Sequence, residues 1–247
     1  MRNSYLICLA VLLLLPFSLF QSAQKTAAAP LAWETLQPLA AARHTHPTTL
    51  LADGRLLVTG GTWHLGLASE TAELYDPMSG QVAPAASMHY ARLDHTATLL
   101  PDGRVLVAGG SGYPAGEFTD PLPLDSAEIY DPALDAWTLL PATMHAARAG
   151  HTATLLADGR VLLAFGETDL TSYTITCETY DFSTQSFTLL PEPSGPGRRD
   201  HTATRLLDGR VLLVGGAAIA SVSLSDAVLF DPVSNTFAST SPIDGER

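Results

Sequence analysis

Lysine is almost absent from this sequence: Lys25 is the only one among 247 residues, and the formal net charge is −12. Most of the arginines stand at positions that recur along the chain, so no basic stripe remains for a polyanion. Nucleic acids and anionic membranes are bound through clustered Lys and Arg, and the composition therefore argues against both as partners. An acidic surface of this kind mainly favours solubility.

Cysteine is nearly as scarce, with Cys8 in an apolar N-terminal stretch and Cys177 far from it. Loss of the N-terminal stretch would leave one thiol, so we expect no disulfide within the chain and predict stability from packing alone. The sequence also lacks Gly-x-Ser-x-Gly, His-Glu-x-x-His, Cys-x-x-Cys and a phosphate-binding glycine loop. No cofactor and no metal are predicted.

The N-terminus has the layout of a secretory signal. Arg2 precedes an apolar core at 6–15, and the small residues Ser22 and Ala23 follow it. We therefore predict a signal peptide over 1–23, a linker over 24–32 and a secreted or extracytoplasmic protein. A retained N-terminal membrane anchor is the alternative. No other stretch approaches the roughly 18 apolar residues of a membrane span, so no membrane insertion is expected after signal cleavage.

A ten-residue segment that begins with His and ends with Asp-Gly-Arg occurs four times, at 46–55, 95–104, 151–160 and 201–210. An arginine stands three residues before each histidine: Arg43, Arg92, Arg148 and Arg198. The Asp-Gly-Arg triplets are 49, 56 and 50 residues apart, a period that indicates a modular array or a propeller. Four units therefore begin near residues 43, 92, 148 and 198.

Each unit is predicted to form four short strands, which in the second unit cover 95–100, 104–108, 127–130 and 136–140. Asp102-Gly103 separates the first two, and Asp-Gly is a strong hairpin signal because glycine supplies the positive φ of a tight turn. The second strand is apolar on both faces, as expected for a sheet stacked between two similar sheets. Radially packed propeller blades provide that environment.

A Gly-Gly doublet followed by two aromatic residues seven positions apart resembles the kelch motif. The paired positions are Tyr75 with Val82, Tyr130 with Trp137, Tyr180 with Phe187, and Phe230 with Phe237. The resemblance covers 33–247 and implies an all-β, kelch-type β-propeller of four-stranded antiparallel blades, whose first strands line a central channel. Phe165-Gly166 in place of one doublet, and Val82 in place of one aromatic residue, depart from the pattern.

The ends of the array leave the blade number open. Residues 33–36 look like a fourth strand without the preceding three, and Arg247 falls in phase with the four repeated arginines. The chain is interpreted as the front part of a larger propeller. A four-bladed ring with a redundant strand is the alternative.

The repeated histidines would form a ring on the inner strands, which suggests a metal site, since His is the commonest metal ligand. Each histidine recurs together with its arginine and threonines, however, which favours a structural role. The arginines are expected to pair with Glu73, Glu128 and Glu178 or with carbonyls at strand ends, and Val228 replaces the glutamate in the fourth unit. The predicted structural set is Arg43, His46, Arg92, His95, Arg148, His151, Arg198 and His201.

Specific binding is predicted on the loops that vary between units. The Asp-Gly and Asp-Pro turns should lie on one face, and the variable loops and linkers on the other. Exposed aromatic rings and carboxylates on stiff loops suit a carbohydrate or a protein ligand. The candidate residues are Trp63, His64, His89, Tyr90, Tyr113, Glu117, Phe118, Asp120, His145, Asp169 and Tyr173. The alternative is that these loops only cover blade edges.

An enzymatic role is the competing hypothesis, because some secreted propellers of this type resemble galactose oxidase, a copper-radical enzyme with a Cys–Tyr cross-link. Cys177 precedes Tyr180 by three residues, but the other units have alanine there, which indicates a small buried residue. We predict a non-catalytic binding scaffold. The alternatives are the propeller part of such an oxidase and a structural or adhesive module of a longer chain.

Overall fold

The computed structural model describes residues 37–240 except 63–65, 116, 118 and 170. The predicted signal peptide, the linker at 24–32, the strand at 33–36 and the segment 241–247 lie outside the described residues. Within the described part, no helix is long and apolar enough to cross a bilayer. The only helical element described is a short 3-10 turn, η1 (Ile219–Ser221).

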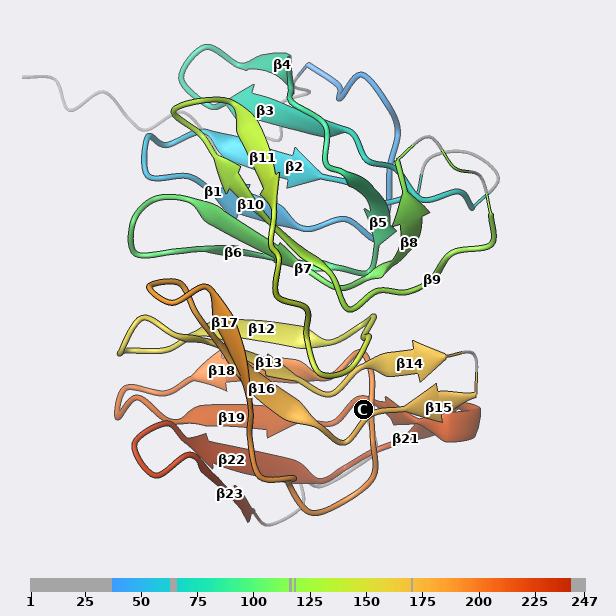
Figure 1. Cartoon of the computed structure of the whole chain (residues 1–247), viewed down its shortest axis with the longest axis vertical. Coiled ribbons are helices and arrows are strands. Elements are labelled where there is room, and N and C mark those ends of the chain that lie inside the picture. The colour runs from blue at the N-terminus through green and yellow to red at the C-terminus, as the bar shows by residue number, and fades with distance from the viewer. Residues whose placement is uncertain (1–36, 63–65, 116, 118, 170, 241–247) are drawn as a thin grey trace, which may run out of the picture. The chain divides into compact units, whose positions relative to one another are not determined.

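Four antiparallel four-stranded sheets form the body of the fold, one from each repeat (Figure 1). The first contains β1 (Thr48–Leu50), β2 (Leu56–Thr59), β3 (Ala72–Asp76) and β4 (Gln81–Ala85). The second contains β6 (Thr96–Leu99), β7 (Val105–Ala108), β10 (Ala127–Asp131) and β11 (Ala136–Leu139). The third contains β12 (Thr152–Leu155), β13 (Val161–Ala164), β16 (Cys177–Asp181) and β17 (Ser186–Leu189). The fourth contains β18 (Thr202–Arg205), β19 (Val211–Val214), β22 (Ala227–Asp231) and β23 (Thr236–Ser239).

The strands of the second unit confirm the expected boundaries to within one residue. Leu99 pairs with Val105, which closes the Asp-Gly turn between β6 and β7. Gly103 has φ +87°, and the Asp102 carboxylate accepts the backbone N–H of Arg104 at 3.1 Å. All four residues of β7 and of β13 are buried, as the apolar pattern on both faces predicted.

Three small sheets, which the sequence did not reveal, are built from the variable loops and one linker. They are a three-stranded sheet of β5 (Tyr90–Leu93), β8 (Ser111–Pro114) and β9 (Leu122–Pro123), and the pairs β14 (Glu167–Asp169) with β15 (Ser172–Tyr173) and β20 (Ala217–Ala218) with β21 (Val222–Ser223). They extend from the ends of the second strands on one side of the fold (Figure 1). The variable loops are therefore partly ordered by backbone pairing.

Apolar side chains gather between successive sheets. Leu106 and Ile129 of the second unit pack with Val161, Tyr180 and Phe187 of the third. Equivalent clusters join the first unit to the second and the third to the fourth. The innermost strands are neighbours in chain order, since β1 contacts β6, β6 contacts β12, and β12 contacts β18. Each core is thus shared by two units.

A buried arginine joins the linker before each unit to that unit's sheet. Arg92 is fully buried, and its Nη1 donates to the carbonyls of Gly109 at 2.8 Å and Ser126 at 3.1 Å. Its Nη2 lies 3.0 Å from Glu128 Oε1. Arg43 and Arg148 pair in the same way with Glu73 and Glu178.

The fourth unit replaces the glutamate without losing the ion pair. Val228 occupies the glutamate position, and the carboxylate of Asp226, two residues earlier, takes its place. Arg198 Nη2 donates to Asp226 Oδ2 at 2.6 Å. The arginine–glutamate pair is therefore limited to the first three units, and an arginine–aspartate pair replaces it in the fourth. The carboxylate is supplied from the residue before the strand instead of from within it.

Phe165 has a backbone conformation that aromatic residues rarely adopt. Its φ is +56°, close to the values of Gly60, Gly109 and Gly215 at the same position in the other units. The ring is buried and packs edge-on against His201, with a centroid distance of 5.2 Å. Arg148 Nη1 donates to its carbonyl at 2.6 Å. Burial and this hydrogen bond hold the strained backbone in place.

Removal of one buried carboxylate should destabilise the fold strongly. Glu178→Ala would leave the Arg148 guanidinium buried without its counter-charge, and the free energy of unfolding should fall by about 3–5 kcal/mol. Asp158→Ala, which breaks a partly exposed pair with Arg160, should cost about 1 kcal/mol or less. Chemical denaturation measures both. Equal losses for the two variants would contradict a dominant role for the buried pair.

At Phe165, glycine should be tolerated better than alanine. Both variants lose the buried ring, but only glycine also relieves the positive φ. Phe165→Gly should therefore be about 1 kcal/mol more stable than Phe165→Ala, the reverse of the usual order in strands. Thermal and urea unfolding of the two variants provide the test, and the usual order would show that the backbone is not strained.

Candidate functional site

The four repeated histidines line one cavity at the inner ends of the sheets, together with Thr45, Asp94, Gly150 and Asp200. The hydrogen bonds of His95, His151 and His201 run between units. Thr96 Oγ1 lies 3.0 Å from His151 Nε2, and Thr152 Oγ1 lies 2.9 Å from His201 Nε2. Each such bond joins one unit to the next along the chain, which gives these histidines a structural task.

The first unit makes the same bond with a different threonine. Pro47 stands where the other units have a hydroxyl-bearing residue. Thr59, on the paired strand, supplies the hydroxyl instead, with Oγ1 2.9 Å from His95 Nε2. The other units have alanine or valine at the position of Thr59. The two substitutions compensate each other, which indicates that the bond itself is important.

Burial keeps these imidazoles neutral. Desolvation, and then the positive charge of the nearby arginines, lowers the pKa of His95 and of His201 to about 3. The pKa of His151 is lowered well below its ordinary value for the same reasons. Within the described residues no group of three or more His, Cys, Asp or Glu side chains is placed to hold a metal ion.

The residue before each histidine lies at the mouth of the cavity and has a positive φ. The values are 55° for Thr45, 52° for Asp94, 59° for Gly150 and 56° for Asp200. Their backbones form a chain of hydrogen bonds across the units, in which each N–H donates to the preceding unit's carbonyl at 3.0 Å. The backbone at the mouth is therefore uniform, and the side chains on it differ.

Asp94 and Asp200 both line this cavity, and they flank Gly150 in the chain of backbone bonds. A Cβ on this glycine would lie 3.1 Å from Asp200 Oδ1, so a larger residue would displace that carboxylate. Burial, and then repulsion from Asp200, raises the pKa of Asp94. Arg199 lies beside them, with Nη1 2.9 Å from Glu167 Oε2. We refer to Asp94, Glu167, Arg199 and Asp200 as the mouth cluster.

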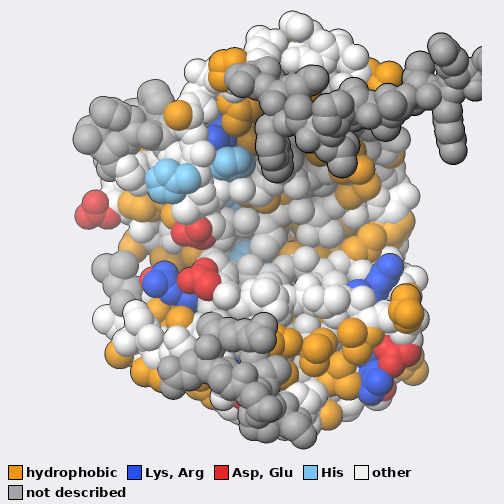
Figure 2. Space-filling model, turned by 180° about the vertical axis from the view of Figure 1, so that it is seen from behind, with side chains coloured by type: hydrophobic (Ala, Val, Ile, Leu, Met, Phe, Trp, Pro, Cys, Tyr) orange, Lys and Arg blue, Asp and Glu red, His pale blue; other side chains and the backbone are white. Residues whose placement is uncertain are grey.

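Figure 2 shows histidine side chains close to acidic and basic ones on one side of the molecule. The Arg199 guanidinium also lies 5.7 Å from the centre of the Tyr173 ring, a predicted binding residue. The mouth cluster itself was missed by the sequence reasoning. The available signal was the variable residue in front of each repeated histidine.

The other predicted binding residues lie in different environments. Tyr113 is buried and its hydroxyl donates to the carbonyl of Ala68 at 3.0 Å, so it is not a surface residue. Tyr90 lies against the Arg92 guanidinium. His89 and His145 are half-exposed, but each Nδ1 bonds a buried glutamate of the Arg–Glu pairs. Three residues are exposed, namely Glu117, Asp120 and Asp169, and three lie outside the described residues, namely Trp63, His64 and Phe118.

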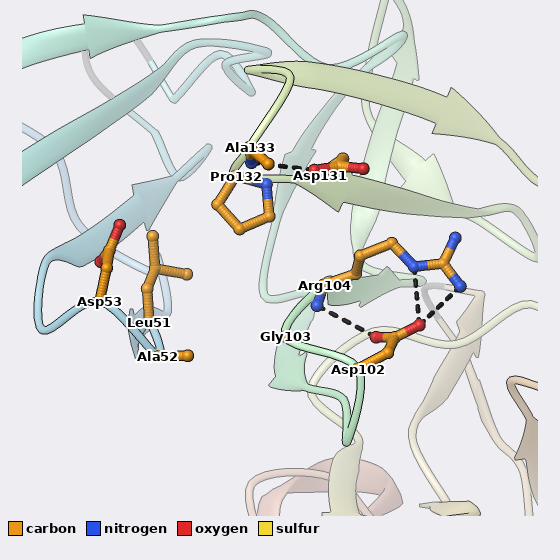
Figure 3. A pocket seen from close by; sticks show the side chains of 9 residues that line it. All are labelled: Leu51, Ala52, Asp53, Asp102, Gly103, Arg104, Asp131, Pro132 and Ala133. Atoms are coloured by element: carbon orange, nitrogen blue, oxygen red, sulfur yellow. Dashed lines mark hydrogen bonds and ion pairs between the residues drawn. The ribbon is translucent and has the colours of Figure 1, made fainter.

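A second depression, of about 450 Å³, lies on the turn side, between the first two units. Asp-Gly and Asp-Pro turns both line it, which confirms that the two kinds of turn share one face. Figure 3 shows Asp102 bonded to Arg104 and Asp131 bonded to the backbone of Ala133, so these carboxylates serve their own turns. At the equivalent place between the second and third units, Phe182 and Pro101 lie close to Gly159: a Cβ on this glycine would be 3.3 Å from the Phe182 ring and 3.6 Å from Pro101. Side chains thus occupy the corresponding space there. The depression is therefore interpreted as a packing gap.

Cys177 and Tyr180 are held on opposite faces of the third sheet. Cys177 is buried in the core shared with the fourth unit, and Tyr180 in the core shared with the second. Burial raises the pKa of the Cys177 thiol to about 12. These two residues do not fit the cross-linked pair of a copper-radical site, and Cys177 acts as a small buried residue.

No protein-family model matches the chain, and no curated protein matches it. The structure of YjhT, a kelch-type propeller, is similar with a TM-score of 0.69 at 14% identity over 85% of this chain and 68% of that chain. A fungal alcohol oxidase of the AA5 family, solved with copper, is similar with a TM-score of 0.51 at 19% identity over 82% of this chain and 54% of that chain. The chain thus spans about half the length of the oxidase. These likenesses show a propeller-like all-β fold.

The buried histidines should make the fold sensitive to acid. Their pKa values are lower in the folded chain than the ordinary 6.5, so below about pH 6 only the unfolded chain takes up protons at these sites. The free energy of unfolding should then fall by up to about 1.4 kcal/mol per pH unit for each histidine. His151→Gln should reduce this slope by about that amount between about pH 6 and 4. Urea titrations across this range test it, and an unchanged slope would contradict it.

Proposed function

We propose that this chain is a secreted, non-catalytic scaffold of kelch-type propeller units that binds a carbohydrate through the face bearing the mouth cluster. The observation that carries the proposal is that Asp94 and Asp200 line the same cavity on either side of Gly150. The fold does not need these carboxylates, since Thr45 and Gly150 hold the same backbone position in the other units. Side chains that the framework does not require are available for a ligand.

The chemistry of the mouth favours a ligand rich in hydrogen-bond donors. Carboxylates only accept hydrogen bonds when ionised, and sugar hydroxyls can donate to them. Arg199 can in turn donate to a ring or hydroxyl oxygen. The cavity measures about 240 Å³, below the usual range for drug-sized ligands, which suits a single sugar residue at the end of a glycan. A protein ligand would need a larger contact area around it.

The resemblance to an oxidase in fold supplies no argument for redox chemistry here, because the same fold supports many functions. The alternative role is a structural or adhesive module. Such a module could use the same face, but it would not need to bind a soluble ligand. Binding of free oligosaccharide therefore separates these two roles.

Variants of the mouth cluster test the proposal. The chain should bind members of a glycan panel, and Asp94→Asn with Asp200→Asn should weaken that binding about tenfold or more, since hydrogen bonds to charged groups contribute about 1.5–3 kcal/mol. Asp53→Asn, on the opposite face, should leave it unchanged. Calorimetry measures the affinities, and thermal melts verify folding. Absence of any glycan binding, or binding indifferent to the mouth variants, would refute the proposal.

A further inference from the structure

The contact between successive units is made three times inside this chain with equivalent residues. The face that each unit turns toward the next, its leading face, presents the leucines Leu57, Leu106 and Leu162 in the three cases. The face toward the preceding unit, its trailing face, presents Val105, Val161 and Val211, together with Tyr130, Tyr180 and Phe230. One interface design therefore recurs, with a leading half and a trailing half.

Polar bonds accompany each of these three contacts. Besides the Thr–His bond, the second glycine of each doublet donates its N–H to the carbonyl of the next unit's arginine, as Gly110 does to Arg148 at 2.8 Å. The chain of backbone bonds at the mouth adds a third connection. A unit that lacks its neighbour would leave all three connections unmade.

The fourth sheet has a leading face with no described neighbour. Leu106 and Leu162 are each 1% exposed, but the equivalent Leu212 is only partly buried, as is Leu229 beside it. Thr202, the counterpart of Thr96 and Thr152, is exposed. No described histidine contacts its hydroxyl. The fourth sheet therefore carries the residues of a leading face, but these residues are not buried as they are in the other three units.

The first sheet has the matching trailing face. Leu56 is partly exposed where Val105, Val161 and Val211 are fully buried. Tyr75 is also partly exposed, unlike its buried counterpart Tyr130. No described threonine hydroxyl bonds His46. The two ends of the described array therefore carry complementary halves of the same contact.

We propose that a second copy of this chain occupies both faces, head to tail, so that two copies close into one ring. Thr202 of each copy then bonds His46 of the other, which reproduces the bond made three times within the chain. A head-to-tail contact forms a closed ring when its rotation closes, and two sets of four sheets give eight, within the known range of propellers. A second copy is favoured over another partner because the chain itself carries both halves of the contact, the leading half on the fourth sheet and the trailing half on the first.

The mass of the purified chain in solution is the first test. Light scattering coupled to size exclusion should give the mass of two chains at micromolar concentration. Leu212→Glu, on the leading face, and Leu56→Glu, on the trailing face, should each yield monomers. The matched control is Val233→Glu, on an exposed turn of the fourth unit, which should remain dimeric. Circular dichroism melts verify that each variant folds.

Mixing the two monomeric variants distinguishes a head-to-tail contact from any other. Each retains one intact face, so a mixture of Leu212→Glu with Leu56→Glu forms one native contact and should recover two-chain species. A monomeric parent chain would overturn the proposal. So would a dimer that only one of the two substitutions dissociates, because that result indicates a contact between like faces or a face covered by residues outside the described part.

Discussion

The fold depends above all on the buried arginine that precedes each sheet. A guanidinium without solvent must find both charge and hydrogen-bond partners, since an unpaired buried charge costs several kcal/mol. Arg92 satisfies this requirement with Glu128 and with carbonyls at the end of the second strand and before the third. One side chain thereby fixes the positions of a linker and two strands. Because the linker is fixed at the arginine, the residues directly after it are positioned too, among them the mouth residue and the histidine.

Contacts between units then transmit this order along the chain. His95, His151 and His201 each bond a threonine of the preceding unit, and each core is filled from two sheets. No sheet is a closed body by itself, as expected for repeat proteins in which neighbours bury each other's faces. The compensation between Pro47 and Thr59 shows that the position of a hydroxyl is maintained even when the residue that supplies it changes.

Much of the framework could be predicted because it is encoded locally and repeatedly. The Asp-Gly turns, the apolar second strand and the paired aromatic positions each recur, so the strands of the second unit were predicted to within one residue. The small sheets could not be predicted, since β8 and β14 pair through backbone atoms and carry no common side-chain pattern. Tyr113 resembled an exposed loop aromatic residue, but pairing of its strand turns it into the interior.

The candidate site was missed for a related reason. Its side chains come from three units, and backbone bonds between distant segments, among them the chain of bonds at the mouth, bring them together. Sequence repetition draws attention to the histidine, whereas the informative residue is the variable one before it. A constant backbone with changing side chains is what a binding surface requires, because specificity can change there without disturbing the fold. Gly150 is an example, since a Cβ at this position would lie 3.1 Å from Asp200 Oδ1 and its missing side chain leaves room for that carboxylate.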